Sequence, residues 1–215
     1  MTELRILSQA RWPDPERADP DLPDRLPPVP GFSASSFNPL VAEAAERCLR
    51  ARHGAAPAPG RTALLLASAS GDRATARAID EAASSGRRVP PLLFFQSNPN
   101  AVLGHIAARW GLTGPVVAIS PVEAPPGGLP QDALDLAALL LADGDADHVL
   151  IVAAEQADPG PGERADTSEP GSTEPADAAE PGASEPGHAS GQAATGPDDG
   201  RTGTDRAVAV LVTTA

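Results

Sequence analysis

The sequence lacks the features that mark secreted, membrane-bound and nucleic-acid-binding proteins. One cysteine among 215 residues excludes an internal disulfide framework. The longest apolar run, residues 133–142, is about half as long as a membrane-spanning helix, and no basic start is followed by an apolar signal core. No basic patch is interleaved with aromatic residues. We therefore expect a cytoplasmic protein with neither a membrane nor a nucleic acid as its partner.

Signatures of metal and cofactor sites are also missing. No spacing of histidine, cysteine and carboxylate residues suits a metal ion. Asp143, Asp145 and Asp147 alternate as in a calcium loop, but the later glycine and the bidentate glutamate are absent. The segment 68–72 (SASGD) has one glycine and none of the spacing that holds a phosphate. The sequence predicts no metal and no cofactor.

A long acidic tract, residues 157–205, contains no Ile, Leu, Val, Phe, Trp or Met. Such a segment cannot bury enough apolar surface to offset the entropy lost on ordering. Its eleven acidic residues against Arg164 and Arg201 supply nine of the thirteen net negative charges. We interpret the tract as a disordered insertion in a loop between two strands; an acidic interaction segment is the alternative. The structured parts are then residues 1–156 and a final strand at 206–215.

The structured part alternates apolar runs with helical patterns, which predicts an α/β fold. The helical pattern at residues 36–53 has Asn38 as a candidate cap, with Pro39 in its first turn. The last helical pattern is apolar over most of its circumference, as in a helix buried within a layered fold. Strands are predicted at residues 4–10, 62–68, 116–120, 148–154 and 207–213, and helices at 36–53, 73–84, 100–110 and 128–144.

Residues 90–99 are predicted to form a loop with four adjacent apolar side chains, which need a surface to cover them. The covering surface is either the core of the same chain or a partner subunit, and the sequence does not decide between them.

Five short motifs follow one another along the chain. They are RTALLLAS at residues 61–68, SASGD at 68–72, FFQSNPN at 94–100, LGHIA at 103–107 and GLTGP at 111–115. Their order and spacing resemble the β-ketoacyl synthases. The resemblance covers residues 4–155 and 207–215, and it implies the N-terminal half of the thiolase fold, with a mixed five-stranded sheet layered with helices.

Active ketosynthases carry a nucleophilic cysteine after the strand that follows Gly-Pro. Counting forward from Gly114 and Pro115 places that position at Glu123, and counting backward from Gly144 places it near Gly127. Neither is a cysteine, and the segment SPVEAPPGG has no thiol or hydroxyl group after its first serine. The resemblance thus implies a ketosynthase-like chain without its nucleophile.

The remaining thiol and imidazole groups do not replace it. Cys48 falls on the apolar stripe of a helix, which favours a buried, unreactive side chain. Active members of the family also need two histidines, or histidine and asparagine, from the second half of the fold, which this chain is too short to contain. His105 matches the Gly-His of the family helix, and a structural role is the favoured interpretation.

We therefore expect a catalytically inactive ketosynthase-like subunit. It resembles the truncated partners and chain-length factors of type II polyketide, aryl-polyene or fatty-acid ketosynthases. The resemblance implies a heterodimer with an active ketosynthase, an indirect link to an acyl carrier protein and a role in shaping the acyl tunnel; self-association is also possible. The implied tunnel and interface residues are Thr75, Ala78, Ile79, Phe94, Phe95, Gln96, Ser97, Asn98, Val116, Val117, Ala118, Ile119 and Ser120.

An enzyme is the alternative from another class. Glu123 stands at one of the two nucleophile-equivalent positions, and it could act as a base in a minimal thiolase-fold decarboxylase or hydrolase of acyl thioesters.

Overall fold

The computed structural model of this chain describes residues 3–14, 25–122, 125, 127–157 and 204–215. Nearly all of the predicted insertion therefore lies outside the described residues. The strands are β1 (Leu4–Trp12), β2 (Thr62–Ala67), β3 (Val116–Ile119), β4 (His148–Glu155) and β5 (Arg206–Thr214). The helices are α1 (Phe37–His53), α2 (Arg73–Ser84), α3 (Pro91–Ser97), α4 (Pro99–Trp110) and α5 (Gln131–Ala142).

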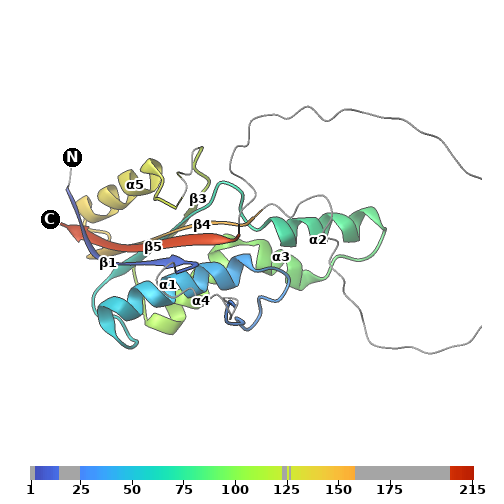
Figure 1. Ribbon diagram of the computed structural model, residues 1–215, viewed down its shortest axis with the longest axis horizontal. Helices are drawn as coiled ribbons and strands as arrows, with labels where there is room; N and C mark the ends of the chain where they lie inside the picture. The colour runs from blue at the N-terminus through green and yellow to red at the C-terminus, as the bar shows by residue number, and fades with distance from the viewer. Residues whose placement is uncertain (1–2, 15–24, 123–124, 126, 158–203) are drawn as a thin grey trace, which may run out of the picture. The chain divides into compact units, whose positions relative to one another are not determined.

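The five strands form one mixed sheet in the order β1-β5-β4-β2-β3 (Figure 1). β2 runs parallel to β3 and β4, whereas β5 is antiparallel to β4 and β1. The interior strand β2, between β4 and β3, is buried along its whole length, as its apolar sequence requires. This arrangement confirms the predicted α/β fold with a mixed five-stranded sheet.

Some strands extend past the ends that the sequence predicts. β1 continues from Ala10 to Trp12, because Arg11 pairs with Val208 and Trp12 with Ala207. β4 and β5 each gain a charged residue where Glu155 pairs with Arg206. A search for apolar runs does not detect charged residues at strand ends. Pairing between segments that are distant in the sequence sets these boundaries instead.

The loop predicted at residues 90–99 is wrong, because Pro91–Ser97 forms helix α3. Proline occupies the first turn of this helix, where its missing N–H costs nothing. A helix of 7 residues is too short to show a helical period, and four adjacent apolar residues hide it further. The Asn98 side chain then caps α4 by accepting from the Asn100 N–H at 3.0 Å.

The predicted cap of α1 is also corrected. Ser36, rather than Asn38, is the N-cap residue, and its side chain makes no cap hydrogen bond; the preceding Ser35 hydroxyl accepts from the Phe37 N–H at 3.0 Å. Asn38 lies inside the helix and is 1% exposed. Its amide nitrogen donates to Asp72 Oδ2 (3.0 Å) and to the Gln96 carbonyl (3.1 Å), so the side chain joins α1 to the segments that begin α2 and end α3.

The two faces of the sheet are covered unequally (Figure 1). α1 and α4 pack on one face and bury a large apolar core that includes Trp12, Phe37 and Trp110. Of the described helices, α5 alone packs on the other face, over a smaller core. The predicted burial of this helix within a layered fold is therefore only partial. Leu139 is 53% exposed, because α5 has a single sheet face to pack against.

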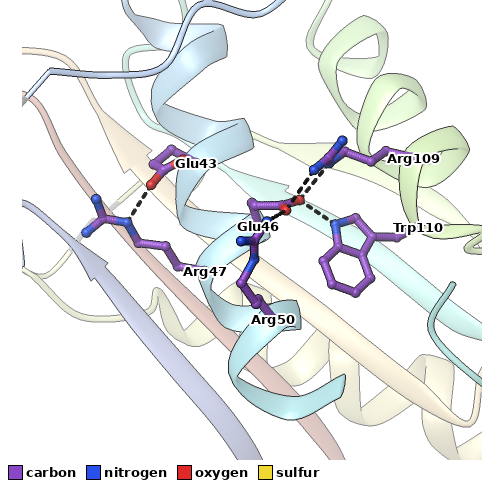
Figure 2. A network of polar contacts seen from close by, with 6 residues as sticks. All are labelled: Glu43, Glu46, Arg47, Arg50, Arg109 and Trp110. Atoms are coloured by element: carbon purple, nitrogen blue, oxygen red, sulfur yellow. Dashed lines mark hydrogen bonds and ion pairs between the residues drawn. The ribbon is translucent and has the colours of Figure 1, made fainter. Parts of the chain in front are cut away.

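An ionic network fastens α4 to α1 on the well-covered face (Figure 2). The Glu46 carboxylate accepts from Arg109 Nε (2.8 Å) and Nη2 (3.0 Å), from Trp110 Nε1 (2.6 Å) and from Arg50. The Arg109 guanidinium is the main cause that lowers the pKa of Glu46 to about 2, against an opposing effect of burial.

The GLTGP motif turns the chain from α4 into the edge strand β3. Gly111 ends α4 with a φ of +66°, in the left-handed region that glycine tolerates best. Gly114 donates its N–H to the Thr62 carbonyl at 3.0 Å. A β-carbon on Gly114 would lie 2.5 Å from backbone atoms of Thr62 and Ala63. The motif therefore allows the close approach that brings β3 beside β2.

Candidate functional site

One of the two nucleophile-equivalent positions, Gly127, lines a cavity of about 210 Å³. The cavity lies where the carboxyl ends of β2 and β4 meet the approach to α5, beside the end of β1 and the start of β5. The other position, Glu123, lies outside the described residues. The described lining consists of Arg11, Trp12, Pro13, Ala67, Pro125, Gly127, Gly128, Pro130, Ala153, Glu155, Arg206, Ala207 and Val208.

The described lining residues carry no thiol, hydroxyl or imidazole group. Cys48 lies instead on α1, on the side that faces the core, with no exposed surface. Burial raises the pKa of the Cys48 thiol, which disfavours the reactive thiolate. Cys48 is the buried apolar residue that the sequence predicts.

The described histidines lie away from this cavity. The His105 ring meets Phe32 edge-on, with ring centroids 6.2 Å apart. His53 ends α1 and His148 begins β4, at the end of that strand opposite to Glu155. Burial is the first cause that lowers the pKa of His53. Among the described residues, no group of three or more His, Cys, Asp or Glu side chains could hold a metal ion.

The predicted interface segments form an apolar surface on α3. Leu92, Phe94 and Phe95 are 48%, 56% and 52% exposed, respectively. Phe95 also contacts Phe32, with ring centroids 5.7 Å apart. The protein's own core thus covers these side chains only in part, and about half of each remains exposed.

The edge strand β3 adjoins this region of the fold through α4. It pairs with β2 on one side, and no described strand pairs with it on the other. Val116 is 39% exposed, whereas Val117, Ala118 and Ile119 are partly buried. An edge strand offers free backbone N–H and C=O groups to another chain.

A second cavity, of about 130 Å³, brings together some of the predicted tunnel residues. Its lining includes Gln96, Ser97, Ala118, Ile119 and Ser120. The rest of its lining comes from Phe37, Asn38, Leu66, Ser68, Gly71, Asp72 and Pro99. Half of these twelve lining residues have polar side chains. Such a wall suits water or a polar group better than an alkyl chain.

The predicted residues on α2, as well as Asn98, lie outside that lining, whereas Gln96 belongs to it. Thr75 is fully buried, and its hydroxyl donates to Asp72 Oδ2 at 2.7 Å. Ala78 and Ile79 are half-buried on α2, which packs mainly against α3. Gln96 is 2% exposed, and its Oε1 accepts from the Ser33 and Ala34 N–H groups. Gln96 therefore organises its own subunit, while Asn98 is exposed.

Sequence reasoning missed how the two ends of the acidic tract are held. The Asp205 carboxylate accepts from the Ala157 N–H (2.9 Å) and from the Ser36 hydroxyl. The Gln156 side chain donates to Ser36 Oγ (3.1 Å) and accepts from the Ala74 N–H (3.3 Å). Gln156 and Asp205 are polar residues at the borders of a low-complexity tract. That position is the sequence feature from which these contacts could be predicted.

Comparison with known proteins identifies the fold. No protein-family model and no curated protein matches the sequence. A solved complex of the ketosynthase ApeO with its chain length factor ApeC, from Xenorhabdus doucetiae, does match. The identity is 18% and the TM-score 0.56, over 100% of this chain and 80% of the matched chain.

Two further solved structures agree. A β-ketoacyl synthase from Burkholderia phymatum STM815 matches with 17% identity and a TM-score of 0.58, over 100% of this chain and 60% of that one. The ishigamide ketosynthase/chain length factor matches with 16% identity and a TM-score of 0.52, over 87% of this chain and 46% of that one. This chain thus spans less than two thirds of the length of either protein. It has a ketosynthase-like thiolase fold.

Proposed function

We propose that this chain is a catalytically inactive ketosynthase-like subunit that pairs with an active ketosynthase. The observation that carries the proposal is the exposed apolar surface of α3, in the same fold as an edge of β3 with which no described strand pairs. Large apolar side chains about half exposed, together with an open strand edge, favour a protein partner. Two of the similar structures are complexes of a ketosynthase with a chain length factor.

The absence of activity is proposed from the cavity at Gly127. Acyl transfer by this fold needs a nucleophile beside groups that handle its proton. None of the described lining residues supplies a thiol, hydroxyl or imidazole group. The chain would then act on the partner's acyl tunnel through α2, α3 and β3. Its link to an acyl carrier protein would be indirect, through the ketosynthase.

The polar lining of the second cavity bears on how a tunnel would form. An alkyl chain gains free energy from apolar walls, and half of the residues in this lining have polar side chains. The half-buried Ala78 and Ile79 of α2 offer a more suitable wall, so we assign the tunnel contact to α2 rather than to this cavity. The product class, polyketide or fatty acid, and a cytoplasmic location belong to the same proposal.

Co-expression with a full-length ketosynthase from the same genome tests the proposal. Size-exclusion chromatography with light scattering should show a 1:1 complex. The complex should also release products of a different length distribution from the ketosynthase alone. A well-folded monomer that ignores the ketosynthase would overturn the pairing. A complex whose products have unchanged lengths would overturn the tunnel role and keep the pairing.

A further inference from the structure

We propose that the cavity of about 210 Å³ at the carboxyl ends of β2 and β4 binds a small organic anion, held through its charged head by Arg11 and Arg206 and through its apolar body by the cavity walls. This site is separate from the α3 and β3 surface and does not depend on the pairing proposed above.

Strand register places both arginines on one face of the sheet. Arg11 on β1 pairs with Val208 on β5, and Arg206 is two residues from Val208 on the same strand. Side chains two residues apart on a strand share a face, as do paired residues of neighbouring strands. Both arginines therefore lie on the same side as Val208, and all three line the cavity.

The carboxylate that could neutralise Arg206 is engaged elsewhere. Glu155 pairs with Arg206 across β4 and β5. Its carboxylate turns instead to the loop after β2, where it accepts from the Ala69 N–H (2.6 Å), the Ser70 N–H (3.2 Å) and the Ser70 hydroxyl (2.5 Å). The carboxylate of Glu155 is thus engaged by this loop and makes no ion pair with Arg206 within the described residues.

Neither guanidinium has a hydrogen-bond or ion-pair partner within the part of the chain that the structure describes. Two positive charges on neighbouring strands repel each other, and an anion between them would remove that repulsion. Guanidinium groups bind carboxylates and phosphates through paired N–H donors. An exposed arginine is ordinarily solvated by water alone. These two arginines instead line a cavity whose walls are mainly apolar.

Small residues create the space. Ala67 and Ala153 have short side chains on this face of the sheet, and Gly127 and Gly128 add no side chain to the wall. Arg11 reaches over this glycine turn, because its Nη1 is 3.9 Å from the place of a β-carbon on Gly127. At about 30 Å³ for each water-sized group, the cavity holds roughly seven groups. That volume suits a carboxylate or phosphate head on a chain of about five carbons.

Isothermal titration of the full chain, or of its complex if it purifies as one, tests the site. Hexanoate and hexyl phosphate are the amphiphilic probes, and whichever binds more tightly identifies the head group. Hexan-1-ol should bind at least about tenfold more weakly than the better anion, because it lacks the charge. Inorganic phosphate should also bind more weakly, because it lacks the apolar body.

Three variants complete the test. The double variant R11A/R206A should weaken binding of the better anion at least about tenfold. R5A removes an exposed arginine of the same strand away from the cavity and should leave binding unchanged. A153L fills the cavity without changing charge and should also abolish binding, while an unchanged thermal midpoint shows that it folds. No saturable binding of either amphiphile, equal binding by R11A/R206A, or equal binding of inorganic phosphate would overturn the proposal.

Discussion

The two faces of the sheet differ in how completely the chain covers them. On one face α1 and α4 bury large side chains, and the Glu46 network of Figure 2 fastens the two helices together. On the other face α5 lies alone, and Leu139 on its outer side is 53% exposed. On the first face the apolar side chains are buried as in the core of a stable domain. On the second face some apolar surface stays exposed to solvent.

A similar contrast separates the two ends of the layer that contains α4. Trp110 at the end of α4 is 2% exposed and hydrogen-bonded to Glu46, whereas Phe94 on the preceding helix α3 is 56% exposed. Among the described helices, α3 exposes Leu92, Phe94 and Phe95, and α5 exposes Leu139. We propose that the ketosynthase partner binds at α3 and β3.

The largest expected effect distinguishes these two open surfaces. Phe94→Asp places a carboxylate on α3, and Leu139→Asp places one on α5 at nearly equal exposure, 56% against 53%. Burying an unpaired charge at an interface is costly. F94D should weaken ketosynthase binding about 100-fold, or about 3 kcal/mol, whereas L139D should change it less than about threefold. Surface plasmon resonance measures both, and the reverse ranking would move the interface to α5.

The next effect tests the close approach of β3 to β2. Gly114→Ala would push a β-carbon into the backbone of Thr62 and Ala63, which should cost about 3 kcal/mol of unfolding free energy. At about 2 to 4 °C per kcal/mol, the melting temperature should fall by about 6 to 12 °C.

Gly104→Ala is the matched control, because Gly104 lies in α4 with no atom within 4 Å of its added β-carbon. It should be neutral or stabilise the helix by up to about 1 kcal/mol. Equal melting temperatures for the two variants would refute the packing described for GLTGP.

A smaller effect tests the well-covered face through pH. The pKa of Glu46 is lowered from 4.5 to about 2, so its contribution is complete above pH 4.5 and is lost as pH falls towards 2. Because Arg109 is exposed, we take the contribution as about 2 kcal/mol after screening. Glu46→Gln should lower the unfolding free energy by this amount at pH 7, and the gap to the unaltered protein should shrink between pH 4.5 and 2.

Glu43→Gln provides the control for this network. Glu43 makes a single ion pair with Arg47 (2.6 Å) one turn along the same helix, which is worth less than about 0.5 kcal/mol. Urea unfolding at several pH values measures both variants. A pH-independent gap for E46Q would contradict the assigned charge effect.

The smallest expected effect concerns the acidic tract. The Ala157 N–H and the Asp205 carboxylate are 2.9 Å apart, so a short loop can join β4 to β5 directly. Replacing residues 158–203 by a four-residue Gly/Ser linker should shift the melting temperature by less than about 2 °C and leave ketosynthase binding unchanged. Loss of folding or of ketosynthase binding would show that the tract contributes to stability or to pairing, which contradicts our interpretation of it as an insertion in a loop.

The sequence predicted most of the sheet well because four of its five strands, all except β1, are mainly apolar runs. It failed at α3, where seven residues are too few for a helical period, and at Asn38, whose partners Asp72 and Gln96 are distant in the sequence. The fold class followed from motifs that keep their spacing, such as GLTGP.

The arginine cavity could not be predicted at all. Arg11 and Arg206 stand near opposite ends of the chain, and only the pairing of β1 with β5 brings them together. Neither belongs to a motif. Glu155 gave no signal either, because its hydrogen bonds go to a loop that lies far from it in the sequence.

Hydrogen exchange of this chain with and without the ketosynthase tests the central claim most directly. If the partner binds α3 and the open edge of β3, backbone amides of residues 92–97 and 116–119 should exchange at least about tenfold more slowly in the complex, while those of residues 131–142 in α5 stay unchanged. Slower exchange in α5, with residues 116–119 unaffected, would contradict the account.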